Sequence, residues 1–86
     1  MAEIKGLLEM ITGAQIREAR KLLGWSPLKL AGRAKIHSAI LRRAEGVEGE
    51  PPLTGYQHAL IRNALQVAGI EFTNDDGPGV QLKVKP

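Results

Sequence analysis

Residues 26–46 have the sequence SPLKLAGRAKIHSAILRRAEG. It begins with Ser26, whose hydroxyl can cap a helix, and Pro27, whose missing N–H costs nothing at the first helical position. Apolar residues then recur at helical spacing in two short runs. They are Leu28, Leu30, Ala31 and Ala34 in the first run, and Ile40, Leu41 and Ala44 in the second. The pattern predicts two helices, over about residues 27–34 and 38–45, separated by a very short turn.

The same stretch is basic, with five cations before its first acid, Glu45. Residues 1–44 hold nine Lys and Arg against three Glu, a net charge of +6, whereas residues 45–86 hold three cations against six acids, a net charge of −3. Such asymmetry indicates that one face meets an anionic partner. The alternative is an ordinary solvated helix surface.

Two capping boxes predict helices on either side of this stretch. Thr12 with Gln15 opens a helix over about residues 13–23, and Thr54 with Gln57 opens another that Gly69 stops. The apolar positions assigned to the later helix are Tyr56, Leu60, Ile61, Ala64, Leu65, Val67 and Ala68.

In the C-terminal part of the chain, the spacing of apolar residues changes from that of a helix to that of a strand. IEFT at 70–73 and VQLKV at 80–84 alternate apolar with polar residues around NDDGPG, which predicts a β-hairpin over about 70–84. A two-stranded hairpin alone is marginal in water, so it must lie on the helices or pair with another chain. We therefore expect one small domain made of an N-terminal extension (1–11) with room for a helical turn or two, a helical part (12–69) and a hairpin (70–86).

Composition argues against catalysis and metal binding. The 86-residue chain has no cysteine, which excludes disulfides, catalytic thiols and thiolate metal sites. His37 and His58 fall in different helices at no metal-binding spacing, so we interpret His37 as a helix cap or phosphate contact and His58 as a helix-surface residue. We expect no enzyme activity, no cofactor and no metal. The sequence shows no signal peptide or membrane span, so a cytoplasmic protein is the expectation.

Several residues, taken together, have the order and spacing that are typical of one known family. They are REARKLLGWS at 17–26, Leu30 and Ala31, Ile36 in the turn, Glu45 near the end of the third helix, and Pro51 after it. With these positions, the chain from Ile16 to about Leu65, roughly 50 of 86 residues, resembles the helix-turn-helix domain of phage-repressor and Cro-type regulators, the XRE family. The resemblance implies a mainly α, lambda-repressor-like fold of four to five short helices, here followed by the β-hairpin.

The resemblance also implies a function: sequence-specific binding of double-stranded DNA by a transcriptional regulator, with the helix at about 38–45 in the major groove. The base-reading positions are then Ser38, Ala39, Arg42 and Arg43. Phosphate contacts are expected from Ser26, Lys29, Arg33, Lys35 and His37. Arg20 and Glu45 are expected to pair and to fix the angle of the reading helix.

The chain departs from the family pattern at a few positions. Lys35 stands where a left-handed glycine is usual, Pro27 replaces a frequent glutamine, and Glu48 and Glu50 make acidic a loop that is often basic. Trp25 is interpreted as a core or boundary residue.

A homodimer is expected, joined by the hairpin and perhaps by the helix that begins after Thr54, with reading helices roughly 34 Å apart. The alternative function is a protein-interaction module, such as an antitoxin or adaptor, that uses the same helices to bind a partner protein.

Overall fold

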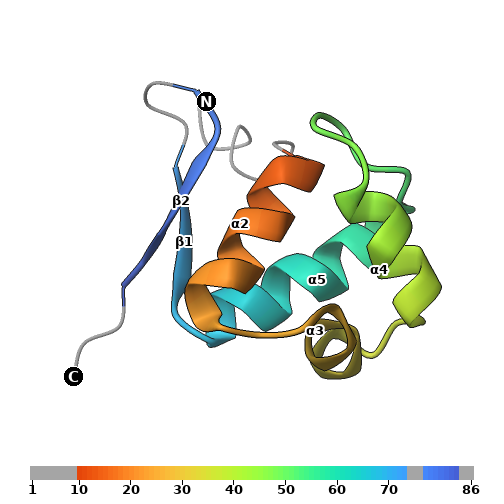
Figure 1. Cartoon of the computed structure of the whole chain (residues 1–86). Helices are drawn as coiled ribbons and strands as arrows, with labels where there is room; N and C mark the ends of the chain where they lie inside the picture. The colour runs from red at the N-terminus through yellow and green to blue at the C-terminus, as the bar shows by residue number, and fades with distance from the viewer. Residues whose placement is uncertain (1–9, 74–76, 84–86) are drawn as a thin grey trace.

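The computed structural model of the protein describes residues 10–73 and 77–83 (Figure 1). Within these ranges the chain forms four helices followed by two strands. They are α2 (Gly13–Leu23), α3 (Pro27–Ala34), α4 (Ser38–Glu45), α5 (Gly55–Val67), β1 (Ile70–Thr73) and β2 (Gly79–Leu82). The prediction of a mainly helical chain with a C-terminal hairpin is confirmed. The expected N-terminal extension, apart from Met10 and Ile11, lies outside the described residues.

The helices begin where the sequence predicts because the expected caps form. In α2 the Thr12 hydroxyl accepts a hydrogen bond from the Gln15 N–H at 3.0 Å, and the Gln15 side chain accepts one from the Thr12 N–H at 2.8 Å. Thr54 and Gln57 repeat this arrangement at the start of α5, with both distances at 3.0 Å. Each box satisfies two N–H groups that the helix itself leaves without partners.

One apolar core joins the four helices, with α2 and α5 in the middle of the molecule (Figure 1). The largest fully buried side chains are those of Ile16, Leu30, Leu41, Ile61 and Leu65, so each helix contributes at least one. Burying a side chain of this kind stabilises the folded state by about 2 kcal/mol. The core therefore fixes α3 and α4 against α2 and α5.

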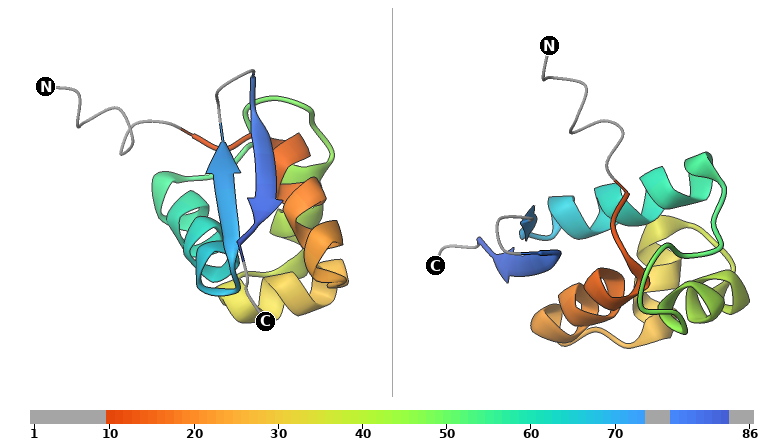
Figure 2. Two further views of the ribbon diagram at one scale, coloured as in Figure 1. Left: turned by 90° about the vertical axis from the view of Figure 1, so that its left-hand side faces the viewer. Right: turned by 90° about the horizontal axis from the view of Figure 1, so that it is seen from above.

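The hairpin lies on the helices, which is one of the two arrangements that the sequence left open. β1 and β2 pair antiparallel, with Ile70 opposite Leu82 and Thr73 opposite Gly79. β2 packs against α2 and β1 against α5. The Gln15 side chain also donates to the Gly79 carbonyl at 2.9 Å, which ties β2 to the start of α2. Figure 2 shows the hairpin and α4 at opposite ends of the molecule.

The predicted end of α5 is confirmed, whereas part of its predicted apolar face is corrected. The helix ends at Val67 and is capped by Ala68, and Gly69 follows with a positive φ of 107°, so the glycine stops the helix as expected. Tyr56 and Val67, assigned to its apolar face, are 74% and 78% exposed. They lie at the two ends of α5, whereas the buried positions of the helix lie between them. No helix in the described part of the chain has the length and apolar character needed to cross a membrane.

Candidate nucleic-acid interface

The turn between α3 and α4 is held by backbone hydrogen bonds. Lys35 adopts a left-handed conformation, with φ 59° and ψ 45°. The Ile36 N–H reaches back to the Ala31 carbonyl at 3.0 Å, which closes the end of α3. A left-handed backbone costs a residue with a β-carbon about 1 kcal/mol. The backbone hydrogen bonds therefore hold a sharp turn that a lysine adopts at some cost.

His37 caps the start of α4, as expected. Its Nδ1 accepts a hydrogen bond from the Ala39 N–H at 3.2 Å, while the ring is exposed. An imidazole that accepts through Nδ1 carries its proton on Nε2. That N–H is left to donate to an anion outside the protein.

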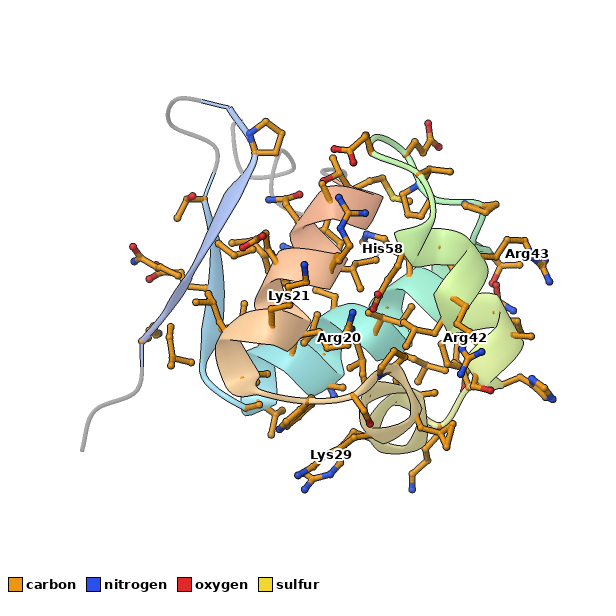
Figure 3. The ribbon with its side chains drawn as sticks, in the orientation of Figure 1. Arg20, Lys21, Lys29, Arg42, Arg43 and His58 are labelled. Carbon is orange, nitrogen blue, oxygen red and sulfur yellow. The ribbon has the colours of Figure 1, made fainter. Side chains whose placement is uncertain are left out.

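The outer face of α4 carries the four predicted base-reading positions. Leu41 and Ala44 are buried in the core, whereas Arg42 and Arg43 are exposed and project from the helix (Figure 3). Ala39 is exposed as well, and Ser38 is half-buried. The structure thus brings these positions together on one helix. Their arginine side chains point away from the core.

The predicted phosphate contacts lie on α3 and in the turns that flank it. Ser26, Lys29, Arg33, Lys35 and His37 are all exposed. Ser26 uses its oxygen as the cap of α3, accepting from the Lys29 N–H at 3.1 Å, and its hydroxyl proton remains to donate to an anion. The opposite face of α3 is buried.

The sequence around these cations contains few acids. The sequence contains no Asp or Glu between Glu18 and Glu45. Among residues 10–73 and 77–83, no ion pair involves Lys29, Arg33, Lys35, Arg42 or Arg43. We refer to these five residues as the outward cations. Apart from Glu45, they are the only Asp, Glu, Lys or Arg residues at positions 27–45, and all five are exposed.

Arg20 and Glu45 form the predicted pair. The Arg20 Nε and Nη2 donate to the two Glu45 carboxylate oxygens at 2.8 and 3.0 Å, and both side chains are largely buried. The remaining nitrogen, Nη1, donates to the Trp25 carbonyl at 2.9 Å. A single guanidinium therefore connects α2 with the end of α4 and with the segment that leads into α3. This two-pronged geometry is specific to arginine.

Arg17, which the sequence analysis did not single out, adds a second connection. Its Nη1 donates to the Glu45 carbonyl at 2.6 Å, and its Nη2 binds the Glu48 carboxylate at 2.8 Å. Glu48 is one of the two acids that make the loop after α4 acidic, and the pairing with Arg17 offsets its charge. The signal in the sequence was the three-residue spacing of Arg17 and Arg20, which places both on one side of α2.

Gly13 lets the loop after α4 approach α2 closely. Its N–H donates to the Gly49 carbonyl at 2.8 Å. A β-carbon at this position would overlap the carbonyl oxygens of Ala44 and Val47. The start of α2 is therefore fitted to the end of α4 and the following loop, which helps to fix the position of α4.

His58 is not a surface residue, and that prediction was wrong. It is only 6% exposed, and its Nε2 accepts a hydrogen bond from the Ile11 N–H at 3.0 Å. Burial, together with the positive charge of Arg62, lowers the pKa of His58. The sequence held a signal for this, because His58 precedes Ile61 by three residues and Leu65 by seven, which is the spacing of one helix face.

No protein-family model, curated protein or solved structure that we compared with the chain gives a significant match. Among the described residues, no cluster of three His, Cys, Asp or Glu could hold a metal ion. The chemistry available at α3 and α4 is that of exposed guanidinium, ammonium and imidazole donors. Such donors are suited to phosphate and to the acceptor edges of bases.

Proposed function

We propose that this protein is a sequence-specific, double-stranded DNA-binding transcriptional regulator that acts in the cytoplasm, with α3 and α4 as a helix-turn-helix and α4 in the major groove. The observation that carries the proposal is the exposed arginine pair on α4, a helix fixed from behind by the Arg20–Glu45 ion pair. A short rigid helix with donors on its outer face fits a groove that admits one α-helix.

Arg42 and Arg43 are the proposed sequence readers. A guanidinium can donate two parallel hydrogen bonds to O6 and N7 of guanine, the commonest specific contact to a base edge. Ser38 and Ala39 lie one turn closer to the start of α4 and offer a hydroxyl and a methyl group. These groups suit a polar base edge and a thymine methyl, respectively.

Lys29, Arg33 and Lys35 are the proposed phosphate contacts, with His37 beside them. Contacts to phosphate set the position and register of a protein on the duplex without reading its sequence. Each neutralised phosphate releases counterions, so the affinity should fall steeply as the salt concentration rises.

We propose a homodimer, because a single module of this size makes few contacts with DNA. In each folded protomer, α4 and the hairpin lie at opposite ends of the molecule (Figures 1 and 2). If the hairpins join the two copies, the α4 helices therefore lie at the outer ends of the dimer. The distance between the two half-sites should then exceed the one-turn spacing of about 34 Å that the sequence alone suggested.

The proposal is tested by replacing Arg42 and Arg43 with alanine. We first select bound duplexes from a random pool with the unmodified protein, which gives the preferred sequence and the half-site spacing. The double variant should then lose at least tenfold in affinity for that sequence, while its binding to random duplex falls much less.

The matched control removes two cations that lie outside the proposed interface, Lys21 on α2 and Lys83 after β2. That variant should keep its preference for the selected sequence. Unchanged binding by the Arg42 and Arg43 variant would show that α4 is not the reading helix. Failure to recover any preferred sequence would count against the function itself.

A protein-interaction module is the second candidate, and the apolar groups on the surface favour it. Val67 is 78% exposed at the end of α5, and Leu82 on the hairpin is 40% exposed. The hairpin also presents strand edges that another chain could extend. An adaptor of this kind should form no salt-sensitive complex with duplex DNA, even at low salt, which separates it from the DNA reader.

A further inference from the structure

Trp25 lies between α2 and α3 with two of the outward cations over its ring. The Lys29 Nζ is 5.5 Å and the Arg33 Cζ 5.1 Å from the ring centroid. The residue is half-buried and packs against the core, which agrees with the interpretation of a boundary residue. Its backbone is held on both sides by Arg20, whose carbonyl accepts from the Trp25 N–H at 3.0 Å and whose Nη1 donates to the Trp25 carbonyl. The ring is thus a fixed platform.

Lys29 and Arg33 are four residues apart in α3, the spacing at which like charges repel on a helix surface. A carboxylate could hold them in place, as Glu45 holds Arg20, but it would also cancel their charge. The face of an indole attracts cations through its quadrupole and carries no net charge. Trp25 can therefore order the two side chains and leave their full charge for a partner.

We infer that Trp25 is a positioning residue that presents Lys29 and Arg33 to the phosphate backbone. The inference rests on the proposed function and deepens it. The ring restricts the conformations of these two long side chains before DNA binds. The side chains therefore lose less conformational entropy when they contact phosphate oxygens.

The variants Trp25→Leu and Trp25→Phe test this role. Leucine keeps an apolar side chain but removes the ring, whereas phenylalanine keeps a weaker aromatic face. Binding is measured by the anisotropy of labelled duplex DNA across a range of salt concentrations. We expect Trp25→Leu to weaken binding about three- to tenfold, and equally for preferred and random duplex, because phosphate contacts carry no sequence information. Trp25→Phe should fall in between.

A double-mutant cycle separates positioning from a merely structural role. Replacing Lys29 and Arg33 together by alanine should cost clearly less affinity in the Trp25→Leu chain than in the unmodified chain, because the ring acts through these two cations. Replacing the two cations should also make the dependence of DNA affinity on salt shallower, and this change should be smaller in the Trp25→Leu chain than in the unmodified chain. The matched pair Arg42 and Arg43, which has no contact with the ring among the described residues, should lose the same affinity in both backgrounds.

Equal losses for Lys29 and Arg33 in both backgrounds would overturn the inference while leaving the DNA-binding function in place. If Trp25→Leu does not fold, the cycle is run with Trp25→Phe. If the unmodified protein binds no duplex, the proposed function fails and the inference fails with it.

Discussion

The arginines of α2 and the outward cations of α3 and α4 are the same kinds of residue in two different situations. Arg17 and Arg20 turn inward, and their guanidinium groups bind the carboxylate, the carbonyl or the loop acid at the end of α4. The outward cations make no ion pair within the described part of the chain. The net charge of +3 hides this division. Which cations are available to an anion therefore depends on where the acids lie.

The two groups are also linked. Arg20 binds Glu45, the last residue of the helix that carries Arg42 and Arg43, so the inward arginines set the orientation of the outward ones. If this division of roles is right, changes to the inward group should act on stability, and changes to the outward group on binding.

The largest expected effect follows from Glu45→Ala. It leaves the largely buried Arg20 without its carboxylate, and removing one partner of such a pair costs about 3 kcal/mol of stability. Urea denaturation followed by circular dichroism measures the loss. Arg42→Ala is the control and should change the free energy of unfolding by less than about 0.5 kcal/mol. Equal effects of the two variants would remove the distinction between inward and outward residues.

Lys35→Gly should raise stability by about 1 kcal/mol, because glycine adopts the left-handed turn without strain. The same change removes one outward cation. We therefore expect a higher unfolding midpoint together with weaker DNA binding and a shallower dependence on salt. Tighter binding by this variant would mean that Lys35 does not face phosphate.

Gly32→Ala is the control for Lys35→Gly, because it should raise stability without removing a charge. Gly32 is exposed within α3, and a β-carbon there meets no atom within 4 Å. Alanine should stabilise the helix by about 0.7 kcal/mol, as measured by thermal unfolding. DNA affinity and its salt dependence should stay the same. A large loss of affinity would instead place DNA directly against this face of α3.

The smallest expected effect concerns His58. This side chain is buried, in contrast to the exposed outward cations. Its folded-state pKa is lowered by burial and by Arg62, so below about pH 6.5 the unfolded chain takes up a proton that the folded chain resists. The free energy of unfolding should fall as the pH drops from 7.5 to 5.5. His58→Gln should reduce this fall, whereas His37→Ser, which keeps a capping oxygen, should preserve it. The opposite result would assign the pH dependence to the exposed histidine.

Local signals were enough to predict the elements. The two capping boxes, the Ser26–Pro27 start and the turn at Lys35 each depend on residues a few positions apart, and the helices begin where these signals place them. The Arg20–Glu45 pair was also predicted, but only through the resemblance to a family, because the two residues are 25 positions apart.

The remaining parts of the fold and of the candidate site depend on contacts between distant segments. The bond from Gln15 to Gly79 spans 64 positions, that from Ile11 to His58 spans 47, and that from Arg17 to Glu45 spans 28. Nothing in the local pattern specifies which distant group such a side chain will meet. The exposure of Tyr56 and Val67 was missed for a related reason, since helical spacing does not reveal how far the core extends along a helix.

The close fit around Gly13 has a consequence for saturation mutagenesis. Every other side chain at this position would collide with the backbone of the α4 end and its loop. In a library scored for cellular abundance, all substitutions at position 13 should disappear, whereas substitutions at positions 42 and 43 should persist. In a library scored for reporter output, all three positions should be depleted. Position 13 would thus serve as an internal calibrator that separates loss of protein from loss of activity.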